Sequence, residues 1–245
     1  LLWPTMALAV FDEYKTKYLC YKGTEYTADE YLGYSFAFDV QSGLPVYITG
    51  KEINDTTFQE SIWRGNEKLA TYDGQIYDML ISPKGKIVYT ISGNPNIKNS
   101  LYVVIDGKQS QPYYTSYGII FTKNDDAIYV AASDTDKYFI VKNNEKITED
   151  YYGINFVKLL PDGKLSYTVF PRISGALNYT PIIIVIGDKK FGPYNTVIFE
   201  DTFDPYQVTS DESGNFAFCV PVSKDTSNEY YFKYILTTNK WINDD

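Results

Sequence analysis

The sequence predicts an all-β protein, and three observations support this class. Aromatic residues make up 17% of the 245 residues, with 25 Tyr and 14 Phe, and these side chains favour strands. Short apolar runs are separated by strong turn signals such as Asp106-Gly107 and Asn143-Asn144. The same turn-and-strand pattern also returns several times along the chain. These features together indicate many short antiparallel strands joined by tight turns.

The first recurring pattern is a turn that leads into an alternating strand. Residues 81–90 and 159–168 carry it most clearly, each with Pro, Gly and Lys in the turn and Tyr89 or Tyr167 in the strand. Looser copies at residues 121–130, 39–48 and 210–219 place Tyr129, Tyr47 and Phe218 at the same position. Gly or Asp in the turn supplies the positive φ that a tight strand connection requires. We therefore expect five turns of one kind.

The second recurring pattern is an apolar strand that ends in a turn pair followed by Lys or Glu. Its copies begin at residues 18, 61, 102, 138, 183 and 232, at intervals of 43, 41, 36, 45 and 49 residues. Four short strands in a period near 40 residues are typical of a propeller blade rather than of a sandwich. We predict a β-propeller of four-stranded antiparallel blades, with six blades. Five or seven blades, or an incomplete ring, are the alternatives.

The repeats divide the predicted single domain, residues 1–245, into six units. These cover about residues 1–31, 32–73, 74–115, 116–152, 153–197 and 198–245. In the first unit, residues 6–11 are expected to form the second strand, which leaves little sequence for an innermost one. Because one blade cannot bury both of its faces alone, neighbouring blades have to stack about 10 Å apart.

Two segments resemble the bacterial WD40-like propeller repeat. Residues 104–114 and 185–195 match its first half, which runs from valine through a turn and lysine to proline and tyrosine. Residues 82–86 and 161–164 match the Ser-Pro-Asp-Gly-Lys turn of its second half. Repeats of this kind belong to the broad TolB-like class, which is often exported from the bacterial cytoplasm. The resemblance implies a propeller fold and a periplasmic or cell-surface location, and it indicates little about activity.

Composition excludes several kinds of chemistry. With 22 basic against 31 acidic residues, the net charge of −9 disfavours binding to nucleic acid or to an anionic membrane. The absence of His removes His-based catalysis and most transition-metal sites. Apolar runs are far shorter than a membrane helix needs. Acidic clusters such as Asp134 and Asp136 lack the ligand spacing of a Ca²⁺ loop. We expect no cofactor and no metal.

The two cysteines, Cys20 and Cys219, lie in apolar runs near opposite ends of the chain. We interpret them as buried free thiols, because two cysteines are ordinary for a core of this size. A single disulfide between them is the alternative.

Periodic tyrosines are interpreted as packing residues, because equivalent positions in each unit contact the neighbouring unit. Non-periodic aromatics are the candidate ligand-binding residues, since adjacent aromatics on a strand point to opposite sides. The candidates are Trp63, Tyr113, Tyr114, Tyr151 and Tyr152, with Tyr230 and Tyr231 as a further pair. Long connections at residues 93–99, 171–178 and 199–206 are the expected places for ligand loops.

The sequence favours a non-catalytic, exported propeller that binds a protein or a carbohydrate polymer through its face loops. One alternative is a carbohydrate-active hydrolase, which would need two carboxylates about 5 to 9.5 Å apart at the axis. Another is a purely structural repeat of a larger surface protein. No catalytic residue stands out, because no two acids share the repeat position expected for an axial pair.

Overall fold

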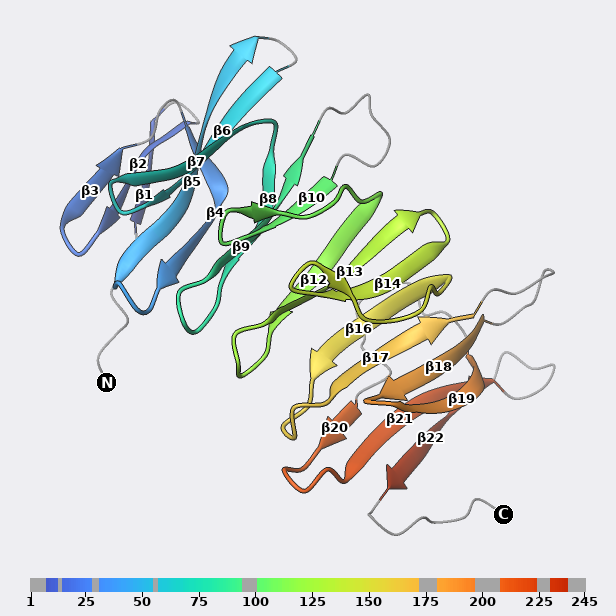
Figure 1. Cartoon of the computed structure of the whole chain (residues 1–245). Helices are drawn as coiled ribbons and strands as arrows, with labels where there is room; N and C mark the ends of the chain where they lie inside the picture. Colours follow the sequence, from blue (N-terminus) through green and yellow to red (C-terminus); the bar gives the residue numbers. More distant parts are fainter. Residues whose placement is uncertain are drawn as a thin grey trace, which may run out of the picture. The chain divides into compact units, whose positions relative to one another are not determined.

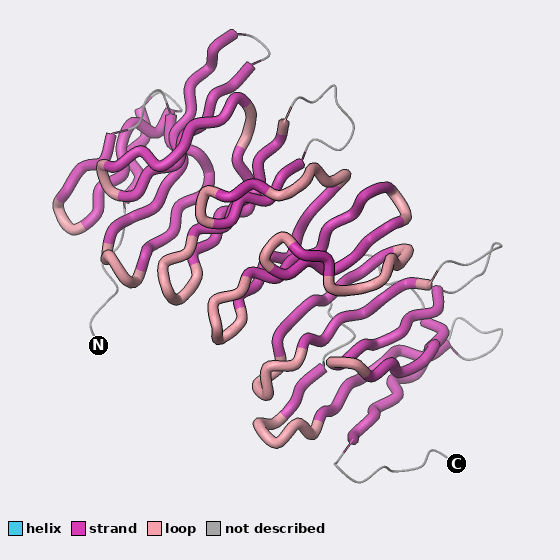
Figure 2. The backbone as a smooth tube through the Cα atoms, viewed as in Figure 1, coloured by secondary structure: helices cyan, strands magenta, loops and turns pink. Residues whose placement is uncertain are grey.

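The fold is all-β, as the sequence predicts, and its strands are arranged in antiparallel sheets. The structure is a computed structural model that describes residues 8–12, 15–27, 31–54, 57–93, 101–171, 180–196, 208–223 and 230–237. Side chains are described for residues 19–26, 35–54, 58–93, 101–171, 181–194 and 208–218. Within these ranges every regular element is a strand, and none is a helix (Figure 2).

The described strands form six sheets, in which each strand pairs with its neighbour in the chain (Figure 1). We number the sheets in chain order. Sheet 1 has β1 (Leu8–Asp12), β2 (Lys15–Tyr21) and β3 (Thr24–Thr27); sheet 2 has β4 (Tyr31–Asp39), β5 (Leu44–Asn54), β6 (Thr57–Arg64) and β7 (Glu67–Asp73); sheet 3 has β8 (Ile76–Ile81), β9 (Ile87–Ser92), β10 (Leu101–Ile105) and β11 (Lys108–Gln109).

The second half of the chain repeats the same order of strands. Sheet 4 has β12 (Thr115–Phe121), β13 (Ala127–Asp134), β14 (Lys137–Lys142) and β15 (Glu145–Lys146); sheet 5 has β16 (Gly153–Leu159), β17 (Leu165–Phe170), β18 (Thr180–Ile186) and β19 (Lys189–Thr196); sheet 6 has β20 (Val208–Ser210), β21 (Phe216–Ser223) and β22 (Tyr230–Thr237). The chain divides at the start of β13 into two compact units, Leu1–Ala127 and Ile128–Asp245, which are described separately below.

Because each sheet is an antiparallel meander, its connections alternate between two ends. We call the end with the turns from first to second and from third to fourth strand the turn end. The opposite end, with the connection from second to third strand and the crossing to the next sheet, is the crossover end. The loops of packed sheets can vary in sequence and length without disturbing the packing. The end of the sheets with the more variable loops is therefore the better place for a binding site.

The turns from first to second strand have one common geometry. In the turns at residues 82–86, 122–126, 160–164 and 211–215, the first N–H donates to the fifth carbonyl and the fourth N–H donates to the first carbonyl. The fourth residue has positive φ in each: Gly85, Asp125, Gly163 and Gly214. The turn of sheet 2 is one residue longer and has Gly43 at this place. The expected five related turns are therefore present, four of them identical in hydrogen bonding.

Consecutive sheets pack face to face within each unit. Val46, Ile48 and Ile62 of sheet 2 form one buried cluster with Ile76 and Met79 of sheet 3. The residues Leu160, Ile182, Ile184, Ile186, Val208, Phe216 and Phe218 form a similar cluster between sheets 5 and 6. Each buried aliphatic side chain contributes roughly 1.5–3 kcal/mol of hydrophobic stabilisation. No single sheet could bury these residues, so the sheets depend on their neighbours.

An aromatic pair recurs at the sheet-to-sheet interfaces. The aromatic residue four positions after the positive-φ turn residue contacts an aromatic residue near the end of the preceding sheet. The pairs are Tyr26–Tyr47, Tyr72–Tyr89, Tyr151–Tyr167 and Tyr194–Phe218, with ring centroids 6.0, 5.9, 6.4 and 6.2 Å apart. This contact explains why the aromatic strand position recurs in the sequence.

First strands carry a second repeated irregularity. Asp78, Gly118 and Phe156 each have positive φ, and each lies four residues before the following turn begins. The pairing of β8 with β9 and of β16 with β17 shifts register at this place. The irregularity is therefore a bulge that repeats with the sheets.

Cys20 is a free, half-buried thiol, so the alternative of a disulfide to Cys219 is not supported. The side chain of Cys219 lies outside the described side chains.

Candidate functional site

Two pairs of adjacent tyrosines lie at equivalent crossings between sheets. Tyr113 and Tyr114 precede β12, and Tyr151 and Tyr152 precede β16. The backbone of the first member bridges to the third strand of its own sheet: Tyr113 N–H donates to Leu101 O at 2.7 Å. Tyr151 N–H donates to Tyr138 O at 2.8 Å in the same way. Both pairs are therefore held on an ordered backbone at the crossover end.

The first tyrosine of each pair is a packing residue. Tyr113 is 1% exposed. Tyr151 is half-buried, and its ring contacts Tyr167. Burial, followed by a hydrogen bond to Glu149, raises the pKa of Tyr151 above its usual value. Burial also raises the pKa of Tyr167 well above the ordinary range. These hydroxyls stay protonated at neutral pH and act as hydrogen-bonding groups within the core.

The second tyrosine of each pair faces solvent. Tyr114 is 39% exposed and Tyr152 is 53% exposed. The N–H of Tyr152 donates to Phe170 O at 3.2 Å, which fixes its backbone against β17. An exposed aromatic ring on a fixed backbone provides contact area at a low cost in conformational entropy, which is typical of binding surfaces. The alternation expected for adjacent aromatics is therefore present in both pairs.

Trp63 is held by contacts within sheet 2. Its ring stacks on Tyr47 at 6.5 Å with an interplanar angle of 7°. Its Nε1–H donates to Thr49 Oγ1 at 2.8 Å, and Lys68 Nζ lies 4.6 Å from its ring centroid. These contacts give Trp63 a structural role within sheet 2, so we do not include it in the proposed binding site.

Other predicted positions lie outside the part of the chain that can be described. Tyr230 and Tyr231 begin β22, but their side chains are not described. The predicted ligand loops at 93–99, 171–178 and 199–206 also lie outside the described residues, apart from Gly93 and Pro171.

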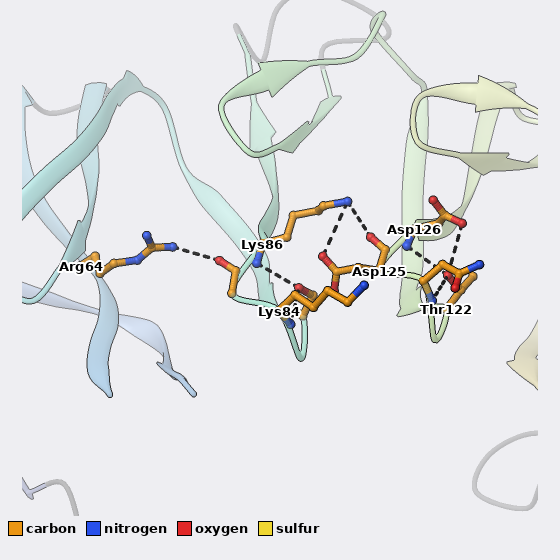
Figure 3. Close-up of polar contacts among 9 residues, drawn as sticks. Arg64, Lys84, Lys86, Thr122, Asp125 and Asp126 are labelled. Atoms are coloured by element: carbon orange, nitrogen blue, oxygen red, sulfur yellow. Dashed lines mark hydrogen bonds and ion pairs between the residues drawn. The ribbon is translucent and has the colours of Figure 1, made fainter. Parts of the chain in front are cut away.

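A repeated cation contact marks the turn end of the sheets (Figure 3). Arg64 Nη2 donates to Gly85 O at 3.0 Å, and Lys86 Nζ donates to Asp125 O at 2.6 Å. In the second unit, a Cβ placed on Gly214 would lie 3.0 Å from Lys164 Nζ. A cation of one sheet thus reaches the positive-φ turn residue of the next sheet in each case. We call this arrangement the turn-end latch.

Each latch also contains a carboxylate. Arg64 Nε lies 3.3 Å from Asp39 Oδ2, and Lys164 Nζ lies 2.6 Å from Asp162 Oδ2. Burial alone would raise the pKa of Asp39. Hydrogen bonds from the Ser42 side chain and from the backbone N–H groups of Gln41 and Ser42, together with the charge of Arg64, lower this pKa by more than burial raises it. The pKa of Asp39 therefore lies below its usual value, and the latch is charged at neutral pH.

Buried carboxylates in the described residues have structural partners. Glu60 Oε2 accepts a hydrogen bond from Ile76 N at 2.6 Å, while Asp39 and Asp125 belong to latches. No group of three or more His, Cys, Asp or Glu side chains in the described residues could hold a metal ion. The described residues also contain no helical segment with the length and hydropathy of a membrane crossing. The hydrolase alternative remains a prediction.

Among the described side chains, three exposed aromatic residues were not identified from the sequence: Phe36, Tyr77 and Phe156. Tyr77 on β8 is 41% exposed, and it directly precedes the positive-φ residue Asp78. Tyr117 precedes Gly118 in the same way, 40 residues later. This spacing of 40 residues is close to the repeat period, and it could have identified the position of Tyr77 from the sequence.

Comparisons with known proteins do not assign a family. No protein-family model matches the chain, and no curated protein matches it either. Among solved structures, a crystal structure of a eukaryotic initiation factor is similar with a TM-score of 0.44 and 13% sequence identity. The similarity covers 85% of this chain and 54% of that chain, so this chain spans about half of that structure. A similarity at this level is too low to assign a function.

The fold thus defines a class: an all-β repeat protein built from antiparallel sheets of the kind found in propeller blades.

Proposed function

We propose that this protein is a non-catalytic binding module of the β-propeller type, which holds a protein or polymeric ligand at its crossover end. The observation that carries the proposal is that, in each tyrosine pair, the first side chain packs against the sheets and the second is exposed. Tyr113 and Tyr151 supply the packing, so Tyr114 and Tyr152 are not needed for it and remain exposed. A large aromatic side chain that is exposed at two equivalent positions supports a role in binding.

The two ends of the sheets differ in a way that favours the crossover end. The turn end is filled by repeated turns and by latches, whose side chains already have partners. The crossover end carries the exposed tyrosines and the connections that differ most in length between sheets. Loops of variable length on a rigid scaffold are where binding proteins usually place their specificity. Export from the cytoplasm stays a prediction based on the family resemblance.

The test is a binding screen on the immobilised full chain against an array of glycans and a library of peptides. Ligands that bind are then measured by calorimetry with the wild type, Tyr114→Ser and Tyr152→Ser. The matched control is Val40→Ser, which removes a side chain that is 77% exposed at the turn end. We expect at least one tyrosine variant to weaken binding about tenfold, a loss of roughly 1.4 kcal/mol, with the control unchanged.

Two results would contradict the proposal. One is equal binding by the wild type and both tyrosine variants, and the other is the absence of any ligand in both collections. Circular dichroism of each variant shows whether a loss of binding reflects loss of the fold.

A further inference from the structure

The first strand of sheet 5 has an aromatic residue in a strained backbone conformation. Phe156 on β16 has φ of 55°, in the left-handed region that bulky residues rarely adopt. The equivalent residues of sheets 3 and 4 are Asp78 and Gly118, which adopt this region more readily. Sheet 5 therefore has the least suitable of the three residues at this position. Backbone strain of this kind is concentrated at functional sites.

The position of Phe156 is at the surface rather than in the core. Its side chain is 39% exposed, and it lies in the bulge where the pairing of β16 with β17 shifts register. Ile154 is buried, but the next two residues, Asn155 and Phe156, are both exposed. In a regular strand one of these two would face the core, so the bulge turns both toward solvent. The first strand thus presents an amide and an aromatic ring at consecutive positions.

The bulge of sheet 3 presents its residues in the same way. Tyr77 and Asp78 are consecutive and both exposed, at the register shift between β8 and β9. Exposure of a polar residue next to an aromatic one is therefore a property of this bulge in both sheets.

A second exposed ring lies close to Phe156 along the chain. Tyr152 is 53% exposed, and its N–H donates to Phe170 O at 3.2 Å. Four residues of extended chain span at most about 13 Å, at roughly 3.3 Å per residue. One short oligomeric ligand can therefore contact both rings. Sheets 3 and 4 do not have this pair, because their equivalent residues are Asp73 with Asp78 and Tyr114 with Gly118.

The charge of this segment favours a neutral ligand. Residues 151–157 contain no charged side chain, although 22% of the chain is charged. Lys190 lies 5.6 Å from the ring centroid of Tyr151, but its Nζ is paired with Glu149 Oε1 at 2.5 Å. The net charge of −9 also repels anionic polymers. A charged ligand would gain little here.

The backbone of β16 favours a sugar chain over a peptide strand. In the described part of the chain β16 pairs only with β17, so its other edge is open. A peptide that adds a strand needs a regular row of edge groups, and the bulge between Asn155 and Lys158 interrupts that row. A sugar chain needs no such row. Aromatic rings pack against its apolar faces, and the Asn155 amide has donors and an acceptor for its hydroxyl groups.

We propose that Tyr152, Asn155 and Phe156 form a binding site for a neutral oligosaccharide chain. The two rings stack against sugar units, and the Asn155 amide hydrogen-bonds to the hydroxyl groups between them. This inference rests on the proposed function, because it names the ligand class and adds two residues to the surface around Tyr152.

The test measures binding of neutral hexasaccharides to the full chain by calorimetry. The probes are cellohexaose, mannohexaose, xylohexaose, chitohexaose and maltohexaose, and the anionic counterpart is hexagalacturonate. We expect at least one neutral hexasaccharide to bind, and hexagalacturonate to bind more weakly than it does.

Substitution of Phe156 separates a binding role from a packing role. Phe156→Gly should weaken binding about tenfold, because it removes a stacked ring. The same variant should keep or raise the melting temperature, since glycine adopts positive φ without strain. Phe156→Tyr keeps the ring and should bind about as tightly as the wild type. The matched control is Ile147→Ser, which removes a side chain that is 47% exposed in the same unit and should leave binding unchanged.

Asn155→Ala provides a second test that does not depend on the stability of the Phe156 variants. Asn155 is exposed, so its substitution should leave the fold intact and weaken binding about tenfold.

Three results would overturn the proposal. In the first, none of the neutral hexasaccharides binds. In the second, Phe156→Gly and Asn155→Ala both bind as the wild type does. In the third, Phe156→Gly lowers the melting temperature without weakening binding, which would make Phe156 a packing residue. If a peptide binds and every neutral hexasaccharide fails, this inference is wrong while the proposed function stands. If glycans and peptides all fail, both are wrong.

Discussion

Lys86 and Asp125 form the turn-end latch between sheets 3 and 4, and Asp125 occupies a backbone position that the related turns give to glycine. Lys86 Nζ donates to Asp125 O at 2.6 Å and lies 3.8 Å from Asp125 Oδ2 (Figure 3). Asp125 has φ of 74°, while Gly85, Gly163 and Gly214 have 84°, 83° and 82°.

The position of the carboxylate in each latch explains why an aspartate replaces glycine at residue 125. The latches at Gly85 and Gly214 have an aspartate in the preceding sheet, Asp39 or Asp162. Sheet 3 has Lys84 at the position of Asp162, so the carboxylate comes from the turn residue of sheet 4 instead. A non-glycine residue at positive φ costs about 1–2 kcal/mol, which the contact with Lys86 offsets.

We predict that Lys86→Met lowers the free energy of unfolding by about 2 kcal/mol, because it leaves the buried Asp125 carboxylate without a cation. The double variant Lys86→Met/Asp125→Gly should be more stable than Lys86→Met alone, since it removes that carboxylate and relaxes the backbone. Urea unfolding measures both. Lys84→Met, at an exposed position in the same turn, serves as the control and should change stability by less than about 0.5 kcal/mol. A double variant less stable than the single one would contradict this interpretation.

The tyrosine pair before β12 should divide into a structural and a surface residue. Tyr113→Ala should lower stability by about 3–5 kcal/mol, because the buried ring leaves a cavity. Tyr114→Ala should change it by less than about 1 kcal/mol, because that ring is largely in solvent. Thermal and urea unfolding of the two variants provide the comparison. Equal losses at both positions would mean that Tyr114 is a packing residue, and would remove it from the proposed site.

Much of the fold could be predicted because turn chemistry is local. Positive φ at Gly85, Asp125 and Gly163 follows from the residue types within five-residue segments, as does the Asp106-Gly107 hairpin. Tyr89 and Tyr167 likewise occupy the same position of a repeat that can be seen in the sequence. These features identify antiparallel sheets of one kind without any long-range information.

The packing role of Tyr113 and Tyr151 was not predictable in the same way. The fourth strands β11 and β15 are two residues long, and each of these tyrosines follows its strand as an isolated bridge. Too few residues alternate there to show a strand period. The exposure of Phe36 also could not be predicted, because burial at that position depends on how neighbouring sheets pack rather than on local sequence.

Stability should fall at alkaline pH because buried tyrosines resist ionisation. Burial and a hydrogen bond to Tyr72 raise the pKa of Tyr89 far above its ordinary value. Above about pH 10 the unfolded chain loses the Tyr89 proton while the folded chain keeps it, so the unfolded state binds fewer protons and unfolding becomes easier. The stabilisation is complete below that pH and is lost as the pH rises further.

Urea midpoints measured from pH 8 to pH 11 check this expectation. Between pH 10 and pH 11, the free energy of unfolding should fall less for Tyr89→Phe than for the wild type. The difference between the two losses should be up to about 1.4 kcal/mol per pH unit. At pH 8 the variant should instead be about 1 kcal/mol less stable, because the Tyr72 hydroxyl loses its partner. Parallel pH profiles for the two proteins would show that the Tyr89 hydroxyl is accessible to solvent.

The crossing from sheet 2 to sheet 3 requires glycine at Gly74. A Cβ at Gly74 would lie 2.3 Å from Ser92 O, and φ is 145°. Gly74→Ala should therefore lower stability by more than about 3 kcal/mol. Gly107→Ala is the matched control, because Gly107 also has positive φ but has open space around its Cα, so about 1 kcal/mol is expected. Similar losses for both variants in urea unfolding would contradict the close approach at Gly74.

The face-to-face packing of successive sheets is tested most directly by a double-mutant cycle on Tyr72 and Tyr89. Their hydroxyl oxygens lie 2.7 Å apart across the interface between sheets 2 and 3. Urea unfolding of Tyr72→Phe, Tyr89→Phe and the double variant gives the coupling energy. The packing predicts a coupling of about 1 kcal/mol. Additive effects, with a coupling below about 0.3 kcal/mol, would contradict it.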